Sequence, residues 1–190
     1  MADEVVGHEE LTEQQQQILL DLARETIRQY VTTGELAELP KGDSAFDRVR
    51  AVFVTLHADG QLRGCIGTLQ AREPLAAAIR SSAISAATQD PRFPAVTADE
   101  LNDIDIEISV LSPLQPVESA DDIIVGEHGV MVQDGMHSGV FLPQVATDQG
   151  WDCETMLNCL CAHKAGLPPD AWRQGANLYV FTAQAFGEKD

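Results

Sequence analysis

The chain has 190 residues, of which 44% are hydrophobic and 22% charged, a composition typical of a globular protein with one sizeable core or two smaller ones. Its 30 acidic and 12 basic residues give a formal net charge of −18. Such an acidic surface repels phosphate groups, which argues against direct binding of nucleic acid or of an anionic membrane. The acidic surface either keeps the protein soluble or binds a basic partner.

The apolar runs and the cysteine content predict a cytoplasmic protein. Residues 1–10 contain neither the basic region nor the apolar stretch of a signal peptide. No run of about 18 apolar residues, the length that crosses a bilayer, occurs in the sequence. The four cysteines are too few for a secreted disulfide scaffold of this size, so we expect reduced thiols.

The N-terminal third predicts a helix followed by a β-hairpin. Thr12 and Gln15 have the spacing of a capping box, and Gly34 is a natural helix end. Residues 49–57 are typical of a strand, and the Asp59-Gly60 pair that follows is typical of a hairpin turn. The returning strand is expected to begin near residue 61 and to run to residue 68.

The middle of the chain predicts a second helix and a half-buried strand. The helix is expected to begin near Pro74 and to end before residues 90–94, where two prolines prevent its continuation. Residues 97–100 can form one short helical turn. Residues 104–110 alternate between apolar and polar side chains, which indicates a strand, and Pro113 and Pro116 are expected to end it.

The C-terminal part predicts a hairpin, a helix and a final strand. The hairpin strands are expected at residues 130–133 and 140–142, with Asp134-Gly135 at the tip and a break at Pro143. A helix is predicted over residues 152–164 and a last strand over residues 178–186. Because strands and helices do not alternate regularly, the order favours an α+β fold over a doubly wound α/β fold.

Residues 63–68 are the segment in which chemistry is most expected. Gly64 and Gly67 interrupt a predicted strand, and glycine in a strand marks a bulge or the close approach of a ligand or another backbone. Arg63 and Cys65 share a strand face, where a guanidinium favours the nucleophilic thiolate. The alternative is that Cys65 is a small buried residue in a tightly packed strand.

Residues 62–68, 90–94, 106–111, 139–145 and 164–167 together resemble, in order, the sequence blocks of the AMMECR family. The resemblance implies one domain over residues 11–187, after an N-terminal extension of residues 1–10. It also implies two subdomains with mainly antiparallel sheets, flanking helices and a cleft between them. No activity comes with it, but prokaryotic members look like companions of a Memo-type protein and a radical S-adenosylmethionine protein. Residues 135–139 depart from the expected pattern, which has a more basic turn.

The candidate site residues fall into two groups. Cys65 is the catalytic candidate suggested by the resemblance, and Glu107 is a further catalytic candidate as general base or as partner of an arginine, unless its strand face is simply solvated. Arg92 could clamp a ligand carboxylate or phosphate, or it could form an internal pair with Asp90 that fixes the loop. The residues expected to bind ligand are Arg63, Gly64, Gly67, Thr68, Asp90 and Arg92.

Metal and cofactor sites are not expected. Cys153, Cys159, Cys161 and His163 lack a C-x-x-C pair, and Cys159 and Cys161 would point to different sides of a helix. The sequence contains no Walker, GxGxxG, HExxH or GxSxG motif. His57 could approach Cys65 from the paired strand and form a Cys–His dyad.

Two hypotheses follow for the function. In the first, a small anionic ligand binds in a cleft centred on Cys65, with or without thiol-dependent catalysis. In the second, the chain is a non-catalytic adaptor that binds a protein partner, and Cys65 only fills space. A third idea, RNA binding, is disfavoured by the charge.

Overall fold

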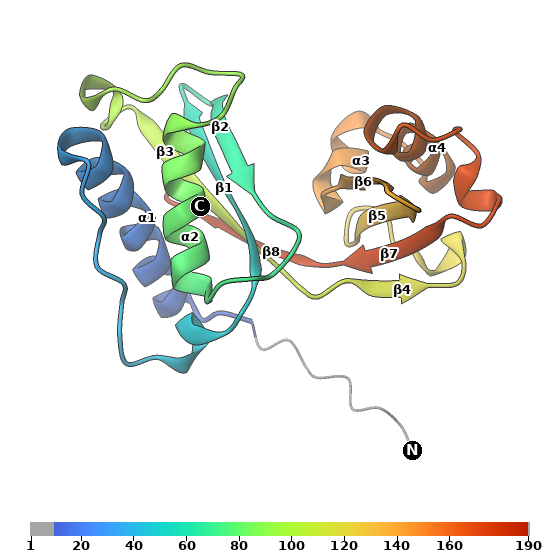
Figure 1. The fold of residues 1–190 in the computed structure, drawn as a ribbon, viewed down its shortest axis with the longest axis horizontal. Helices are drawn as coiled ribbons and strands as arrows, with labels where there is room; N and C mark the ends of the chain where they lie inside the picture. The colour runs from blue at the N-terminus through green and yellow to red at the C-terminus, as the bar shows by residue number, and fades with distance from the viewer. Residues whose placement is uncertain (1–9, 190) are drawn as a thin grey trace. The chain divides into compact units, whose positions relative to one another are not determined.

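The computed structural model describes residues 10–189, and the described chain forms two four-stranded antiparallel sheets with helices, which confirms the predicted α+β fold (Figure 1). The chain divides into two compact units. Unit 1 runs to Leu111 and includes the C-terminal segment from Gln184, and unit 2 is Ser112–Ala183. The N-terminal extension predicted for residues 1–10 lies outside the described residues except for Glu10. No helix among residues 10–189 is long and apolar enough to cross a membrane.

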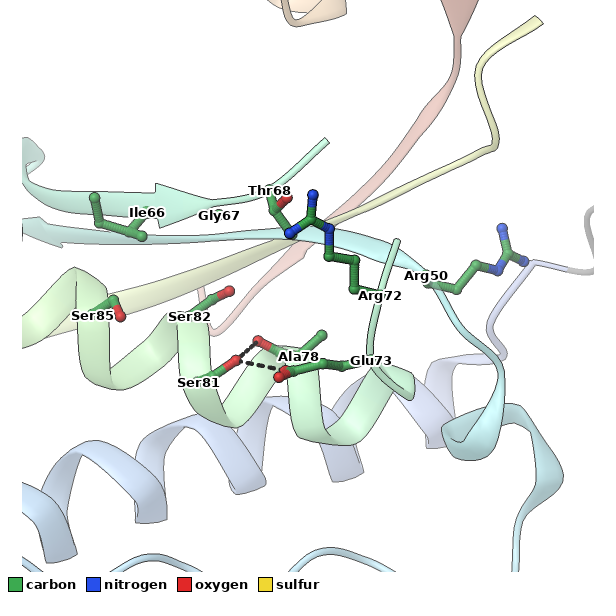
Figure 2. A pocket seen from close by; sticks show the side chains of 10 residues that line it. All are labelled: Arg50, Ile66, Gly67, Thr68, Arg72, Glu73, Ala78, Ser81, Ser82 and Ser85. Atoms are coloured by element: carbon green, nitrogen blue, oxygen red, sulfur yellow. Dashed lines mark hydrogen bonds between the residues drawn. The ribbon is translucent and has the colours of Figure 1, made fainter. Parts of the chain in front are cut away.

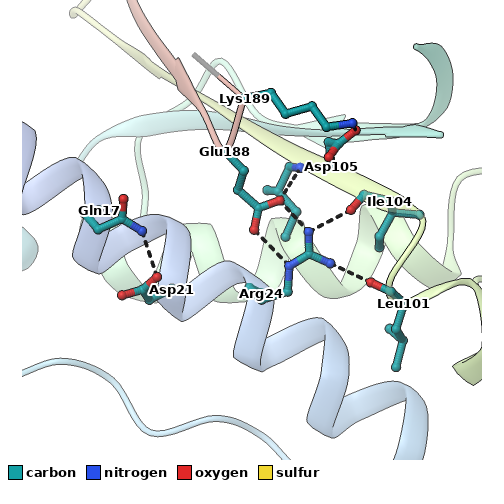
Figure 3. Close-up of polar contacts among 9 residues, drawn as sticks. Gln17, Asp21, Arg24, Leu101, Ile104, Asp105, Glu188 and Lys189 are labelled. Carbon is teal, nitrogen blue, oxygen red and sulfur yellow. Dashed lines mark hydrogen bonds and ion pairs between the residues drawn. The ribbon is translucent and has the colours of Figure 1, made fainter. Parts of the chain in front are cut away.

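Unit 1 begins with helix α1 (Glu13–Thr33), whose ends are those predicted. Thr12 and Gln15 form the capping box, and Gly34 closes the helix with a φ of 76°. Arg24 then ties α1 to the rest of the unit: its guanidinium donates to the carbonyls of Leu101 at 2.8 Å and Ile104 at 2.7 Å and pairs with Glu188 (Figure 3). Because these partners are far apart in sequence, Arg24 joins both ends of the unit.

The sheet of unit 1 has the strand order β2-β1-β3-β8. The hairpin of β1 (Ala51–Ala58) and β2 (Gln61–Gly67) turns at Asp59 and Gly60, whose φ angles are 50° and 73°, as a two-residue hairpin loop requires. Strand β3 (Ile104–Leu111) follows, and β8 (Ala183–Gly187) is at the far edge.

One face of this sheet packs against α1 and α2 (Leu75–Thr88), as Figure 1 shows. Alternate residues of the strands, such as Val54 and Ile108, are fully buried there. The intervening residues therefore lie on the opposite face. We call this opposite face, which carries Thr55, Cys65 and Glu107, the Cys65 face.

Unit 2 has the strand order β4-β7-β5-β6 and its own apolar core. Val130, Leu157 and Leu160 are fully buried in that core. Two helices pack with the sheet, and the second continues into a π-helical turn that ends at Gly166. The elements are β4 (Gln115–Val117), β5 (Gly129–Asp134), β6 (His137–Phe141), α3 (Pro143–Gln149), α4 (Cys153–Cys159), η4 (Leu160–Ala165) and β7 (Asn177–Phe181).

Short 3-10 helices connect these elements. The helical turn predicted at residues 97–100 is present as η2 (Ala98–Glu100), capped by Thr97. The remaining ones are η1 (Ser44–Asp47), η3 (Ala120–Asp122) and η5 (Ala171–Arg173).

Several predictions for unit 2 were wrong in detail. Pro116 lies inside β4, which the sequence did not predict, and it is tolerated because β4 is an edge strand. Pro143 occupies the first turn of α3, so it begins a helix and does not merely end a strand. Asp134 pairs with His137, so the loop of the hairpin is Gly135-Met136 rather than Asp134-Gly135.

The single strand predicted over residues 178–186 was also wrong, because it is two strands. Strand β7 belongs to the sheet of unit 2, whereas β8 belongs to the sheet of unit 1. The chain changes sheets at Thr182, which exchanges hydrogen bonds of 2.9 Å with Ser112 through its backbone N–H and carbonyl.

Candidate functional site

Strand β2 places Cys65 at the edge of the sheet of unit 1. The backbone N–H of Cys65 donates to Asp90 Oδ2 at 2.9 Å, and its carbonyl accepts from Arg92 Nη2 at 3.3 Å. These two groups point outward from the sheet, where no further strand of unit 1 is available to pair with them. The segment at residues 90–94 therefore satisfies the polar backbone of Cys65 at an otherwise open edge.

Asp90 and Arg92 form the internal pair that was one of the two alternatives for them. Asp90 is only 4% exposed, and its carboxylate accepts from Arg92 Nε at 2.9 Å and Nη2 at 2.7 Å. The Arg92 guanidinium holds the pKa of Asp90 well below its usual range, mainly through these hydrogen bonds. Arg92 itself is half-exposed and lies over the ring of Phe93, at 5.4 Å from its centroid.

Arg63 is bound to the same loop at a second point. Its Nε and Nη2 donate to the two carboxylate oxygens of Glu100 at 2.9 and 3.2 Å, and its Nη1 donates to the carbonyl of Pro94 at 2.9 Å. The side chain of Arg63 is 13% exposed. Hydrogen bonds from Arg63 lower the pKa of Glu100 to about 2. The guanidinium that was expected to act on Cys65 is thus engaged by the segment at residues 94–100.

The side chain of Cys65 is half-buried on the Cys65 face. Thr55 lies directly opposite on β1, and its Oγ1 donates to Cys65 Sγ at 3.2 Å. Glu107 on β3 lies directly opposite Thr55 on the other side, so Cys65, Thr55 and Glu107 form one row across three strands. Side chains two strands apart are separated by about 10 Å, and Thr55 lies between them.

The Cys–His dyad was wrong in register. His57 lies opposite Leu62, and a register shift between Leu56 and His57 separates it from the pairing that brings Thr55 to Cys65. The residue beside the Cys65 sulfur is therefore a hydroxyl and not an imidazole.

The two glycines of the segment allow close approach of other backbone. A Cβ atom on Gly64 would lie 2.3 Å from the carbonyl oxygen of Ala86 in α2, and one on Gly67 would lie 2.2 Å from the carbonyl oxygen of Val52. Both distances are shorter than any normal contact. Of the alternatives that glycine in a strand indicates, backbone approach is the one found here.

A pocket of about 270 Å³ lies between the end of β2 and helix α2 (Figure 2). Gly67 and Thr68, two of the predicted ligand-binding residues, line it. The guanidinium of Arg72 lies beside Thr68, across the pocket from the serines of α2. The lining residues that sequence reasoning missed are Arg50, Ile66, Arg72, Glu73, Ala78, Ser81, Ser82 and Ser85.

The serines carried a signal that could have indicated the pocket. Ser81, Ser82 and Ser85 recur at helical spacing in α2, whose other residues are mostly alanine and isoleucine. A hydroxyl stripe on such a helix is unusual in a face that packs against a sheet. No sequence pattern indicated Arg72, because it lies in the loop before α2, where side chains follow no regular spacing.

The remaining cysteines belong to unit 2. Cys161 is fully buried, and burial raises the pKa of its thiol. The pKa of Cys153 is raised for the same reason. Between residues 10 and 189, the structure contains no group of three or more His, Cys, Asp or Glu side chains arranged to hold a metal ion.

Comparison with known proteins places this chain in a family. The AMMECR1 family model matches residues 20–186. The chain belongs to the AMMECR1 family. AMMECR1-family relatives include a Methanococcoides burtonii protein, 45% identical over 88% of this chain and 86% of its own length. Another from Methanothermobacter thermautotrophicus is 46% identical over 90% of this chain and 92% of its own length.

A solved structure has the same fold as this chain. The crystal structure of the uncharacterized protein PH0010 from Pyrococcus horikoshii matches with a TM-score of 0.83 and 40% sequence identity, covering 90% of each chain. The helices and sheets described above are thus those of an AMMECR1-family fold.

Proposed function

We propose that this AMMECR1-family protein binds a small ligand on the Cys65 face and uses the Cys65 thiol as a nucleophile. The observation that supports this most is the fixation of Cys65. Its backbone N–H and carbonyl are both held by the Asp90–Arg92 pair, while its sulfur is half-buried beside Thr55. A nucleophile held in one position loses little entropy on reaching a ligand.

In the proposed step, the Thr55 hydroxyl, which donates to Cys65 Sγ in the structure, turns to accept the thiol proton and passes its own proton to the Glu107 carboxylate. A hydroxyl can carry this proton because it both accepts and donates hydrogen bonds. The sulfur forms a bond to an electrophilic carbon of the ligand, and the proton returns from Glu107 to the ligand atom that received the electron pair. This addition needs no oxidant, reductant or second substrate.

Complementation of a deletion strain tests the thiol. We expect Cys65→Ala and Cys65→Ser to fold normally and to fail to restore function, because neither carries a nucleophilic thiolate. Cys161→Ala is the matched control for folding, since Cys161 is buried in the other unit. Full activity of the Cys65→Ala variant would exclude the nucleophile and support the second candidate function.

That second candidate is a non-catalytic adaptor that binds a protein partner in the cytoplasm. It is favoured by the internal pairing of Arg63 with Glu100 and of Arg92 with Asp90, because both arginines then serve the frame of the fold. The family resemblance adds partners to this proposal, namely a Memo-type protein and a radical S-adenosylmethionine protein. Co-purification of the three proteins from one host, with Cys65→Ala as bait, separates the two functions. An adaptor keeps its partners in that variant and remains active.

A further inference from the structure

The pocket between β2 and α2 is lined by a serine whose hydroxyl is not paired with another described residue. Ser82 is 7% exposed, and among the described residues its hydroxyl has no hydrogen-bond partner. In Figure 2 this hydroxyl points into the pocket, toward the end of β2. This hydroxyl is open to the pocket and is not bound to a protein acceptor within residues 10–189, so a ligand with an acceptor oxygen can take its hydrogen bond.

The neighbouring serines differ from Ser82, because their hydroxyls are engaged. Ser81 donates to Glu73 at 3.1 Å, and Ser85 donates to Gln89 at 3.1 Å. Ser82 is therefore the hydroxyl of α2 that remains available to a ligand.

The charges around the pocket favour an anion. Arg50, Arg72 and Glu73 line it, which is formally one excess positive charge. The Arg50 guanidinium points away from the serines in Figure 2, so Arg72 is the cation that faces them. The carboxylate of Glu73 accepts a hydrogen bond from Ser81. Arg72 donates to Gln70 in its own loop, which leaves further donors of its five for a ligand. This local positive charge stands out in a chain with a net charge of −18.

We infer that this pocket binds a small oxyanion, a phosphate monoester or a carboxylate, through the Arg72 guanidinium and the Ser82 hydroxyl. The pocket's volume of about 270 Å³ accommodates a small organic molecule around the charged group. Ile66 and Gly67 supply an apolar wall for that part of the ligand. Thr68 also lines the pocket and adds a polar side chain to it.

The site is separate from the thiol chemistry proposed above. Ile66 lines the pocket, whereas Cys65, the preceding residue of β2, directs its side chain to the opposite face of the sheet. Failure of either proposal therefore leaves the other intact. The Cys65→Ala variant is expected to bind an oxyanion in this pocket as the unaltered protein does.

The test is an NMR titration of the full chain with phenyl phosphate and, separately, with benzoate, at about 0.15 M salt so that diffuse charge effects are screened. We expect saturable shifts of the amides of Gly67, Thr68 and Ser82 with at least one probe. The probe that binds more tightly identifies the ligand as phosphate or carboxylate. Absence of saturation of these amides with both probes up to about 10 mM overturns the inference.

Three variants show whether binding occurs through the named groups. Arg72→Gln is expected to weaken binding roughly tenfold or more, because it removes a charge-assisted hydrogen bond. Ser82→Ala is expected to weaken binding by about threefold. This variant should fold normally, because alanine favours the helix. Arg28→Gln, which removes an exposed arginine of α1, is the charge control and should change affinity by less than about twofold. Equal affinity of Arg72→Gln and the unaltered protein overturns the inference.

Discussion

Residues 63–65 and residues 66–68 are neighbours on strand β2, yet their surroundings differ. Arg63 is bound to Glu100 and Pro94, and the backbone of Cys65 is bound to Asp90 and Arg92. Residues 66–68, in contrast, line a pocket that also contains Arg72. Residues 63–65 are thus hydrogen-bonded to the loop at residues 90–100, whereas residues 66–68 line a pocket.

The difference shows that the charged residues of a motif need not bind a ligand. Arg63 and Arg92 hold the loop at residues 90–100 against β2, and so fix the position of Cys65. Arg72, which lies outside the motif, has donors available for a ligand in the pocket.

Gly64→Ala is expected to destabilise the protein by about 3 kcal/mol, because a Cβ would lie 2.3 Å from the Ala86 carbonyl oxygen and the helix backbone must move. Urea unfolding measures this as a lower midpoint at an unchanged slope. Gly135→Ala is the control: no atom lies within 4 Å of its added Cβ, so only its φ of 56° contributes strain, roughly 1 kcal/mol. Similar losses in both variants would show that α2 does not pack closely on β2 at Gly64.

Asp90→Asn is expected to cost about 2 kcal/mol of stability, because Arg92 loses its carboxylate while the Cys65 N–H can keep an acceptor. The half-exposed position of Arg92 keeps the loss below that of a fully buried pair. Urea unfolding again provides the measurement. The charge control is Asp59→Asn in the β1–β2 turn, and an equal effect there would contradict the role assigned to Asp90.

Arg63→Gln is expected to destabilise the protein by roughly 1 kcal/mol, whereas Arg72→Gln should change stability by less than about 0.5 kcal/mol. The reason is that Arg63 holds Glu100 and Pro94 across the loop, while Arg72 donates only to its near neighbour Gln70. Thermal unfolding of both variants under one set of conditions compares them. A larger loss of stability in Arg72→Gln than in Arg63→Gln would show that Arg72, and not Arg63, supports the fold.

The two carboxylates predict a dependence of stability on acid. The pKa of Asp90 in the folded protein is lowered, and that of Glu100 is lowered to about 2, chiefly by hydrogen bonds from Arg92 and Arg63 respectively. Their contributions to stability are thus fully present above the unfolded pKa values of about 4, and are lost as the pH falls below them. Unfolding midpoints measured between about pH 5 and pH 2 should fall less steeply in a variant carrying Asp90→Asn and Glu100→Gln. An unchanged slope would show that these groups titrate normally.

Elements with strong local signals could be predicted from the sequence. The capping box of Thr12 and Gln15, the turn at Gly60 and the alternation in β3 each depend on residues close together in the chain. Strand β4 has only three residues and exists through its pairing with β7, so no local pattern indicated it. The division of β7 from β8 depends likewise on which sheet each strand joins.

The candidate site shows the same limit. The positions of Cys65 and Gly67 in a strand could be predicted, and so could the loop held by Pro91 and Pro94. That Thr55, not His57, lies beside the Cys65 sulfur depends on strand register, which a shift after Leu56 alters. The pocket of Arg72 and Ser82 forms only when α2 packs against the sheet, so the spacing of the serines in α2 was its one local signal, and Arg72 had none.

The most direct test of the proposed function is the rate of alkylation of each cysteine in the native protein, measured as a function of pH by mass spectrometry. We predict that Cys65 reacts fastest, since its sulfur is half-buried and fixed beside Thr55, and that Cys161 reacts slowest, because it is fully buried and its thiol pKa is raised. We further predict that Asp90→Asn alters the rate at Cys65 alone. If Cys65 is as unreactive as Cys161 across the pH range, the nucleophile is contradicted and Cys65 serves the packing of β2.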